Sequence, residues 1–184
     1  MSLLNKARVE LRIGGHGGQG VILAGQILGR AATLFDRWNA TTTQSYGPEA
    51  RGGACNSSIV LSREPVLYPY VTHPDVLILF SREAYDKFGP ELAPDGVLVI
   101  EEGLRGVVEE HPGVEIHTCP AIRIAEEMDV KIAANVVLLG MFVTATGLLS
   151  KEAVEESIGA SLRPHTVDAG LRCFAEGYNW YTAA

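Results

Sequence analysis

Apolar residues recur along this chain with two different spacings. Short runs that alternate with polar residues, or are wholly apolar, predict strands at 8–13, 38–44, 54–62, 75–80, 97–100 and 114–118. Apolar residues spaced by three and four predict helices at 19–35, 82–88, 121–128, 132–147, 151–159 and 165–181. Strands therefore alternate with helices up to Pro120, and the rest of the chain is helical.

This order of elements predicts the fold class. Strands that alternate with helices are typical of a parallel sheet with helices on both faces. The run Asp75–Phe80 is apolar without alternation, as in a strand covered on both faces. We therefore expect an α/β fold of three layers, α/β/α, around a mostly parallel, Rossmann-like sheet. A hairpin at one edge, over 54 to about 69, would make the sheet mixed.

Two local signals refine this picture. Gly25 and Gly29 lie on adjacent turns of the first helix and would let it approach the sheet closely. Ser81 directly precedes the helix over 82–88 and is a candidate for its N-cap.

Size and charge exclude several classes of protein. The 184 residues, of which 47% are hydrophobic, fit a single domain over 1–184 with a helical C-terminal part. A net charge of −7 without a basic cluster disfavours nucleic acid as a partner. The most apolar run, Ile132–Leu149, contains Asn135, two threonines and two glycines, so it predicts a buried helix rather than a membrane span. Met1–Lys6 is too short and polar for a signal peptide, and no membrane partner is expected.

The three cysteines, Cys55, Cys119 and Cys173, are odd in number and far apart. Disulfide frameworks, metal knuckles and iron–sulfur clusters need closely spaced pairs, so none is expected within this chain. Separate thiols are typical of the reducing cytoplasm, where we expect the protein to work. Because no nucleophile–base pair stands out either, the sequence predicts no metal ligand and no catalytic residue of its own.

A glycine-rich segment follows the first strand and opens the first helix. Its sequence, Gly15-His16-Gly17-Gly18-Gln19-Gly20, fits the pattern in which backbone N–H groups bind a diphosphate. Gly15, Gly17, Gly18, Gln19 and Gly20 are therefore candidate cofactor-binding residues. Their alternative role is close packing or a subunit contact, Gln19 could instead cap the helix, and His16 is better explained as a residue that stabilises the loop. The second strand, 38–44, lacks the acidic residue of a dinucleotide site, which disfavours NAD.

A second loop, Ser45–Gly53, follows the second strand and should project from the same carboxyl edge of the sheet. Its candidate binding residues are Tyr46, Gly47, Arg51 and Gly52. The guanidinium of Arg51 could bind a carboxylate or phosphate through two hydrogen bonds. An ion pair with Glu49, or with another subunit, is the alternative.

The two loops together resemble those of one protein family. The segments concerned are Gly15–Val21, Ser45–Gly53, Ala54–Ser57, Pro74–Asp75 and the spacing Asn135 to Gly140. Over about 12–160 the chain resembles the gamma subunits of 2-oxoacid:ferredoxin oxidoreductases. The second loop is most similar to the 2-oxoglutarate type, with the branched-chain 2-oxoacid type close behind and the pyruvate type further away. Ala50 departs from the 2-oxoglutarate type, which often has methionine there.

The resemblance implies a function as well as a fold. The assembled enzyme would convert a 2-oxoacid and coenzyme A to acyl-CoA and CO2, with electrons passing to ferredoxin. Thiamine diphosphate, magnesium and iron–sulfur clusters would lie in alpha, beta and ferredoxin-like delta partner subunits, and coenzyme A is a candidate ligand of the two loops at the subunit interface. Two other hypotheses remain open, an independent nucleotide-binding module and a purely structural subunit.

Overall fold

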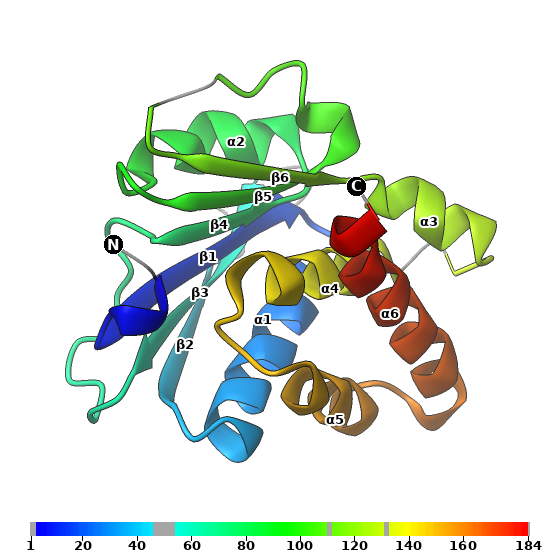
Figure 1. The fold of residues 1–184 in the computed structure, drawn as a ribbon, viewed down its shortest axis with the longest axis horizontal. Helices are drawn as coiled ribbons and strands as arrows, with labels where there is room; N and C mark the ends of the chain where they lie inside the picture. The colour runs from blue at the N-terminus through cyan, green and yellow to red at the C-terminus, as the bar shows by residue number, and fades with distance from the viewer. Residues whose placement is uncertain (1–2, 46–53, 110–111, 131–132, 184) are drawn as a thin grey trace.

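The computed structural model describes residues 3–45, 54–109, 112–130 and 133–183, with side chains described up to 180. Within these residues, six strands form one mixed sheet (Figure 1). They are β1 (Arg8–His16), β2 (Asn39–Ser45), β3 (Ala54–Ser62), β4 (Val76–Leu79), β5 (Val97–Glu101) and β6 (Glu115–Cys119). Their order in space is β2-β3-β1-β4-β5-β6.

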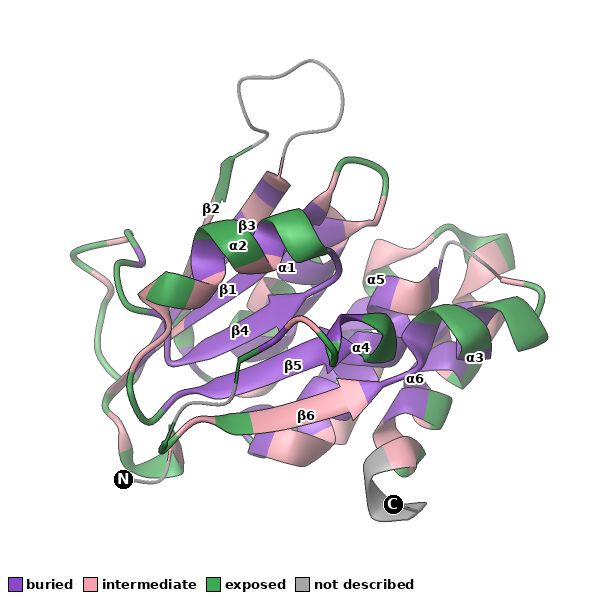
Figure 2. Cartoon of the chain, turned by 90° about the horizontal axis from the view of Figure 1, so that it is seen from above, coloured by how far each residue is buried: buried purple, intermediate pink, exposed green. Residues whose placement is uncertain are grey.

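Helices cover both faces of this sheet. They are α1 (Val21–Arg30), α2 (Arg82–Phe88), α3 (Ala121–Glu127), α4 (Ala134–Thr146), α5 (Lys151–Ser161) and α6 (Val167–Ala183). α2 lies on one side, and the other five lie on the opposite side (Figures 1 and 2). The expected three-layer α/β/α fold is therefore confirmed. None of the described helices is long and apolar enough to cross a membrane.

The mixed character of the sheet has a different origin from the expected hairpin over 54–69. β3 runs antiparallel to both of its neighbours, β1 and β2, whereas β1, β4, β5 and β6 pair in parallel. Residues 63–75 contain no strand. β2 therefore has the direction of β1, and the two strands end at the same edge of the sheet.

The two elements that flank the glycine-rich segment differ in their bounds from the sequence prediction. β1 continues through Gly14, Gly15 and His16, because these residues pair with Asn56, Cys55 and Ala54 of β3. The glycine-rich loop is thus confined to 17–20, and Gly15 belongs to a strand. The first helix begins at Val21 rather than at 19, and it ends in a π-helical turn, η2 (Ala31–Phe35).

The strands bury their two faces in two separate apolar clusters. Val76 and Ile78 of β4 lie in the cluster beneath α1 and α4, whereas Leu77 and Leu79 lie in the cluster beneath α2. This confirms that the wholly apolar run of β4 is covered on both faces. Figure 2 shows the same pattern, with the central strands buried.

Glycines allow the closest contacts between layers. A Cβ on Gly25 would overlap Ser57 Oγ of β3, and one on Gly29 would lie 2.7 Å from Thr42 Oγ1 of β2. α1 therefore approaches the sheet as closely as Gly25 and Gly29 predicted. Ser81 caps α2 as expected, because its hydroxyl oxygen accepts a hydrogen bond from the Ala84 N–H group at 3.2 Å.

α4 is buried on every side. Every residue from Asn135 to Val143 is buried, so the helix has no face toward solvent. It packs against α6 at Gly140 and Gly177, where an added Cβ would overlap the backbone carbonyl oxygen of Phe174 or of Val137. The backbones of α4 and α6 are in direct contact at this crossing. A larger residue would therefore clash with backbone atoms, which cannot rotate away as a side chain could.

Replacing Gly140 by alanine should therefore destabilise the protein. We expect Gly140→Ala to lower the free energy of unfolding by about 1–3 kcal/mol, because α4 and α6 must separate. Gly159→Ala in α5 is the matched control, since its Cβ would meet nothing within 4 Å. The free energy of unfolding of Gly159→Ala should rise by about 0.5–1 kcal/mol, because alanine has a higher helix propensity than glycine. Urea unfolding would measure both, and equal effects would contradict the proposed packing.

Candidate functional site

The carboxyl edge of the sheet holds the first glycine-rich segment and the strand ends that flank the second. β1 ends at His16, which pairs with Ala54, and β2 ends at Ser45, which pairs with Asn56. The residues that flank the second loop therefore lie beside the first loop, as expected from the sequence. Tyr46, Gly47, Arg51 and Gly52 themselves lie outside the described residues.

The glycines of the first segment serve different purposes. Gly18 and Gly20 have φ values of 95° and 73°, a conformation that glycine adopts at little cost. A Cβ on Gly17 or Gly18 would meet no atom of the described residues within 4 Å, so these residues leave the space above the turn open. A Cβ on Gly15 would instead lie 2.7 Å from Gln19 Oε1, so that glycine serves packing.

The side chain of Gln19 holds the loop in place. Its Oε1 accepts a hydrogen bond from the His16 N–H group at 2.7 Å, and its Nε2 donates to the Phe80 carbonyl oxygen at 3.4 Å. Gln19 thus ties the end of β1 to the residue after β4. It does not cap α1, which has no side-chain cap.

The start of α1 can attract an anion. Gly20 occupies the N-cap position without a side-chain acceptor, so the N–H groups of Val21, Ile22 and Leu23 have no helical partner. The Gly20 carbonyl oxygen accepts a hydrogen bond from Asn135 Nδ2 of α4 at 3.1 Å. Asn135 is 2% exposed, and the loop is therefore anchored to the core.

His16 and Glu83 are in close contact beside this loop. His16 Nε2 lies 2.9 Å from Glu83 Oε2, and Glu83 is in the first turn of α2. The pKa of Glu83 is lowered by its own backbone N–H group and, to a smaller extent, by His16. The contact joins the end of β1 to α2, which agrees with a stabilising role for His16.

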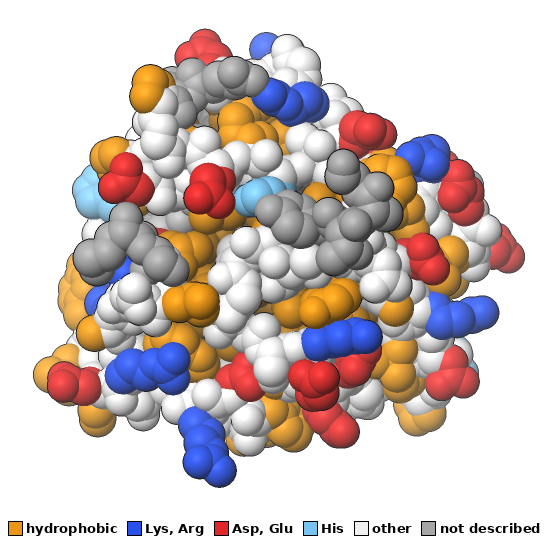
Figure 3. Space-filling view, viewed as in Figure 1, with side chains coloured by type: hydrophobic (Ala, Val, Ile, Leu, Met, Phe, Trp, Pro, Cys, Tyr) orange, Lys and Arg blue, Asp and Glu red, His pale blue; other side chains and the backbone are white. Residues whose placement is uncertain are grey.

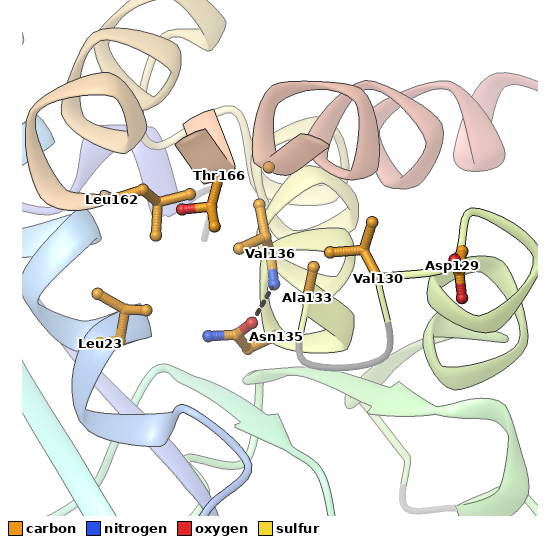
Figure 4. A pocket seen from close by; sticks show the side chains of 9 residues that line it. Leu23, Asp129, Val130, Ala133, Asn135, Val136, Leu162 and Thr166 are labelled. Carbon is orange, nitrogen blue, oxygen red and sulfur yellow. Dashed lines mark hydrogen bonds between the residues drawn. The ribbon is translucent and has the colours of Figure 1, made fainter. Parts of the chain in front are cut away.

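An apolar pocket of about 410 Å³ lies behind the first turn of α1 (Figure 4). Leu23, Asn135, Val136 and Leu162 contribute to its wall, from α1, the start of α4 and the end of α5. Sequence reasoning missed this pocket because its walls come from segments far apart in the chain. The polar Asn135 within an apolar run was the one available signal.

Glu101 ends β5 at the same edge and holds the first turn of α3. Its Oε2 accepts a hydrogen bond from the Ile122 N–H group at 3.1 Å. Burial raises the pKa of this carboxyl group, and the backbone N–H groups of Ile122 and Ala121 partly offset that effect. The N-cap residue of α3 is Pro120, which offers no side-chain acceptor, so Glu101 accepts from the first turn instead.

The described thiols and acids do not form a metal centre. No three His, Cys, Asp or Glu side chains within the described ranges are grouped so that they could hold a metal ion. Cys55, Cys119 and Cys173 are free and buried in β3, β6 and α6. Burial raises the pKa of all three thiols, that of Cys119 to about 12, so they are weak nucleophiles at neutral pH.

A model of the protein family described as pyruvate ferredoxin/flavodoxin oxidoreductase matches residues 10–180. The chain belongs to this family. It is 45% identical over 176 residues to the 2-oxoglutarate synthase subunit KorC of Methanocaldococcus jannaschii, covering 94% of each protein. The resemblance to the 2-oxoglutarate type is thereby confirmed. The chain is also 33% identical over 179 residues to the ketoisovalerate oxidoreductase subunit VorA of Methanothermobacter thermautotrophicus, of which it covers 36%.

Two solved structures have the same fold. The keto/oxoacid ferredoxin oxidoreductase gamma subunit of Geobacter sulfurreducens is 34% identical, with a TM-score of 0.84, covering 96% of this chain and 99% of that one. The 2-oxoglutarate:ferredoxin oxidoreductase of Magnetococcus marinus, with 2-oxoglutarate, coenzyme A and succinyl-CoA bound, has a TM-score of 0.85 at 22% identity. That match covers 98% of this chain and 32% of the longer one.

The pKa of Glu101 leads to a prediction about pH. Because its folded-state value lies above the usual 4.5, the folded chain binds this proton more tightly than the unfolded chain. The free energy of unfolding should therefore fall as pH rises above 4.5 through the folded-state pKa, by at most about 1.4 kcal/mol per pH unit. Glu101→Gln keeps an acceptor and should remove this dependence in urea unfolding between about pH 4 and pH 8. The exposed neighbour variant Glu102→Gln should retain most of it, because the charge of Glu102 raises the pKa of Glu101 less than burial does. An unchanged slope in Glu101→Gln would contradict the assignment.

Proposed function

We propose that this chain is the gamma subunit of a 2-oxoglutarate:ferredoxin oxidoreductase and is not catalytic alone. The observation that carries the proposal is the end-to-end match to the KorC subunit, at 45% identity over 94% of both proteins. The complete enzyme would convert 2-oxoglutarate and coenzyme A to acyl-CoA and CO2, with electrons passing to ferredoxin. A branched-chain 2-oxoacid or pyruvate enzyme of the same family is the alternative.

The partner subunits would bring the reactive groups. Thiamine diphosphate with magnesium supplies the decarboxylation chemistry when bound, and iron–sulfur clusters supply electron transfer. We assign these groups to alpha, beta and ferredoxin-like delta subunits, with 1–184 as a single gamma-type domain. The three buried, free thiols of this chain support that division, because a cluster needs several grouped cysteines. They also fit a reducing cytoplasm as the place where the enzyme works.

We assign the carboxyl edge of the sheet to coenzyme A. This cosubstrate carries a diphosphate, and three features of the first loop suit that group. The described residues leave open space above the turn at Gly17 and Gly18, and the N–H groups that start α1 have no helical partner. The helix dipole adds about 0.3–1 kcal/mol for an anion at an exposed site. Tyr46, Gly47, Arg51 and Gly52 would complete the site from the second loop, and the coenzyme A in the Magnetococcus marinus enzyme supports the choice of ligand.

The residues of this chain would then bind and orient, without taking part in bond making. Gln19 and Asn135 hold the loop through the hydrogen bonds to His16, Phe80 and Gly20. A loop held in this way loses little conformational freedom when the diphosphate binds. Its position would fix the direction from which the thiol of coenzyme A reaches the thiamine site of the partner subunits.

The other two hypotheses are less well supported. A purely structural role for the loop is favoured by Gly15 and Gln19, which serve contacts within the chain. Contacts within the chain do not account for the space that the described residues leave at Gly17 and Gly18. An independent NAD-binding module is disfavoured, because β2, Asn39–Ser45, carries no acidic residue for the ribose.

The first experiment is an affinity purification of the native complex from the source cell. We expect subunits with thiamine diphosphate and iron–sulfur clusters to co-purify, and the fraction to reduce a viologen dye with 2-oxoglutarate and coenzyme A. Comparison with branched-chain 2-oxoacids and pyruvate would identify the substrate. A monomer or homodimer without such partners would contradict the proposal.

A second experiment tests the assignment of coenzyme A. Gly17→Val adds bulk where the folded chain leaves space, so the complex should assemble normally while its KM for coenzyme A rises about tenfold or more. The KM for the 2-oxoacid should not change. Gly106→Val is the matched control, since its Cβ would also meet nothing within 4 Å. A normal KM in assembled Gly17→Val, or a loss of assembly, would favour the purely structural role.

A further inference from the structure

The exposed apolar side chains are concentrated at one edge of the sheet. The large hydrophobic residues in solvent, within the described part of the chain, are Leu4, Leu34, Phe35, Leu67, Tyr68, Tyr70 and Ile122. All except Ile122 belong to segments that precede β1, precede β2, or connect β3 to β4. These segments meet at the amino edge of the sheet, opposite the glycine-rich loops. Figure 3 shows apolar side chains along the left margin, where the β3–β4 connection lies in Figure 1.

Three of these residues, including the most exposed one, lie in the segment 65–70, which we call the aromatic loop. Leu67 is 94% exposed, and Tyr68 and Tyr70 are 56% and 59% exposed. The two tyrosine rings stack edge to face, with their centroids 5.4 Å apart. An apolar side chain held this far in solvent is typical of a protein–protein contact.

Charged side chains of β1 bind the backbone of this loop and of the residue that follows it through hydrogen bonds. Arg8 Nη1 donates to the Tyr68 carbonyl oxygen at 3.0 Å, and Arg8 Nη2 donates to that of Tyr70 at 3.3 Å. Arg12 Nη2 donates to the Val71 carbonyl oxygen at 2.7 Å.

Glu10, between these two arginines, completes the support. Its Oε2 accepts from the Thr72 N–H group at 2.9 Å, and its Oε1 pairs with Arg8 Nη2 at 2.9 Å. Arg8, Glu10 and Arg12 alternate along β1, so their side chains share one face of the sheet. The loop backbone is therefore fixed before any partner binds, which lowers the entropic cost of association.

A hollow of about 480 Å³ adjoins the loop. Arg8, Glu10, Leu67 and Tyr68 are among its lining residues, so it offers both apolar and charged walls. A partner side chain with an apolar body and a polar tip fits such a hollow. The aromatic loop and the hollow resemble a protein–protein interface, because exposed aromatic side chains lie beside a hollow that can bind a side chain of the partner.

The longer relatives indicate which partner covers this edge. The chain corresponds to 36% of the VorA subunit and, in fold, to 32% of the Magnetococcus marinus chain. In both proteins the domain is joined covalently to a longer stretch of polypeptide. In the KorC subunit, of which this chain covers 94%, no stretch of comparable length remains, so the equivalent stretch would belong to another subunit of that enzyme.

We propose that the aromatic loop and its hollow at the amino edge form the docking surface for the partner subunit that corresponds to the remainder of those longer relatives. The inference rests on the proposed function, since it assumes a multi-subunit enzyme. With this docking surface, the protein would bind its ligand at the carboxyl edge of the sheet and its partner subunit at the amino edge.

The test uses the complete enzyme, co-expressed with an affinity tag on this chain. Leu67→Asp places a charge at the most exposed apolar position and leaves the backbone hydrogen bonds of the loop intact. We expect the retained partner subunit to fall about tenfold or more, with the unfolding temperature of the isolated variant unchanged. Ile122→Asp is the matched control, because Ile122 is 46% exposed on α3 and away from this edge. It should retain the partner fully.

Three outcomes would overturn the proposal. Full retention of the partner by Leu67→Asp would do so while leaving the proposed function intact. Equal losses in Leu67→Asp and Ile122→Asp would point to a general charge effect. A wild-type homodimer that Leu67→Asp converts to a monomer, with the partner retained, would identify a second copy of this chain as the occupant. If the wild-type chain captures no such partner at all, the proposed function fails first, which the dye assay would show independently.

Discussion

The burial of α4 on every side constrains the rest of this structure. A helix that is apolar from Val136 to Val143 has to be enclosed by other elements, because water would be in contact with any face left open. The sheet, α1, α3 and α6 provide the enclosure, and α6 comes close enough only because of Gly140 and Gly177. Asn135, the polar residue at the start of α4, is buried as well, and its amide group donates to the Gly20 carbonyl oxygen. The core thereby determines where the glycine-rich loop lies.

This arrangement gives the two edges of the sheet different properties. At the carboxyl edge, the described residues leave space open beside Gly17 and Gly18, while the amide group of Gln19 holds the turn. At the amino edge, the alternating charges on β1 hold the loop between β3 and β4. Arg12 is 8% exposed, and its charge is satisfied by Glu91, by Ser58 Oγ and by the Val71 carbonyl oxygen. These partners compensate the cost of burying the charge of Arg12. Loss of the Glu91 carboxylate would leave that buried charge uncompensated.

The sequence was informative wherever a structural cause is local. Alternation and helical spacing located the strands and helices, Ser81 capped α2, and Gly25 and Gly29 marked the approach of α1 to the sheet. Pairing between distant segments could not be predicted in this way. Gly15 was assigned to a loop because the pairing of β1 with β3, which keeps it in a strand, depends on a segment about forty residues away. The hydrogen bond between Asn135 and Gly20 joins positions 115 residues apart. The pocket beside it is likewise lined by residues from distant segments.

The dependence on partner subunits follows from how the reactive side chains near the carboxyl edge are used. Within the described residues, Glu101 holds the start of α3, and His16 pairs with Glu83. The pKa of the Cys119 thiol is raised to about 12, so it is protonated at neutral pH. Each of these described groups is committed to the fold or unreactive, whereas the N–H groups at the start of α1 have no helical partner. The proposed roles follow this division, with the anionic cosubstrate assigned to the start of α1 and the reacting groups assigned to neighbouring subunits.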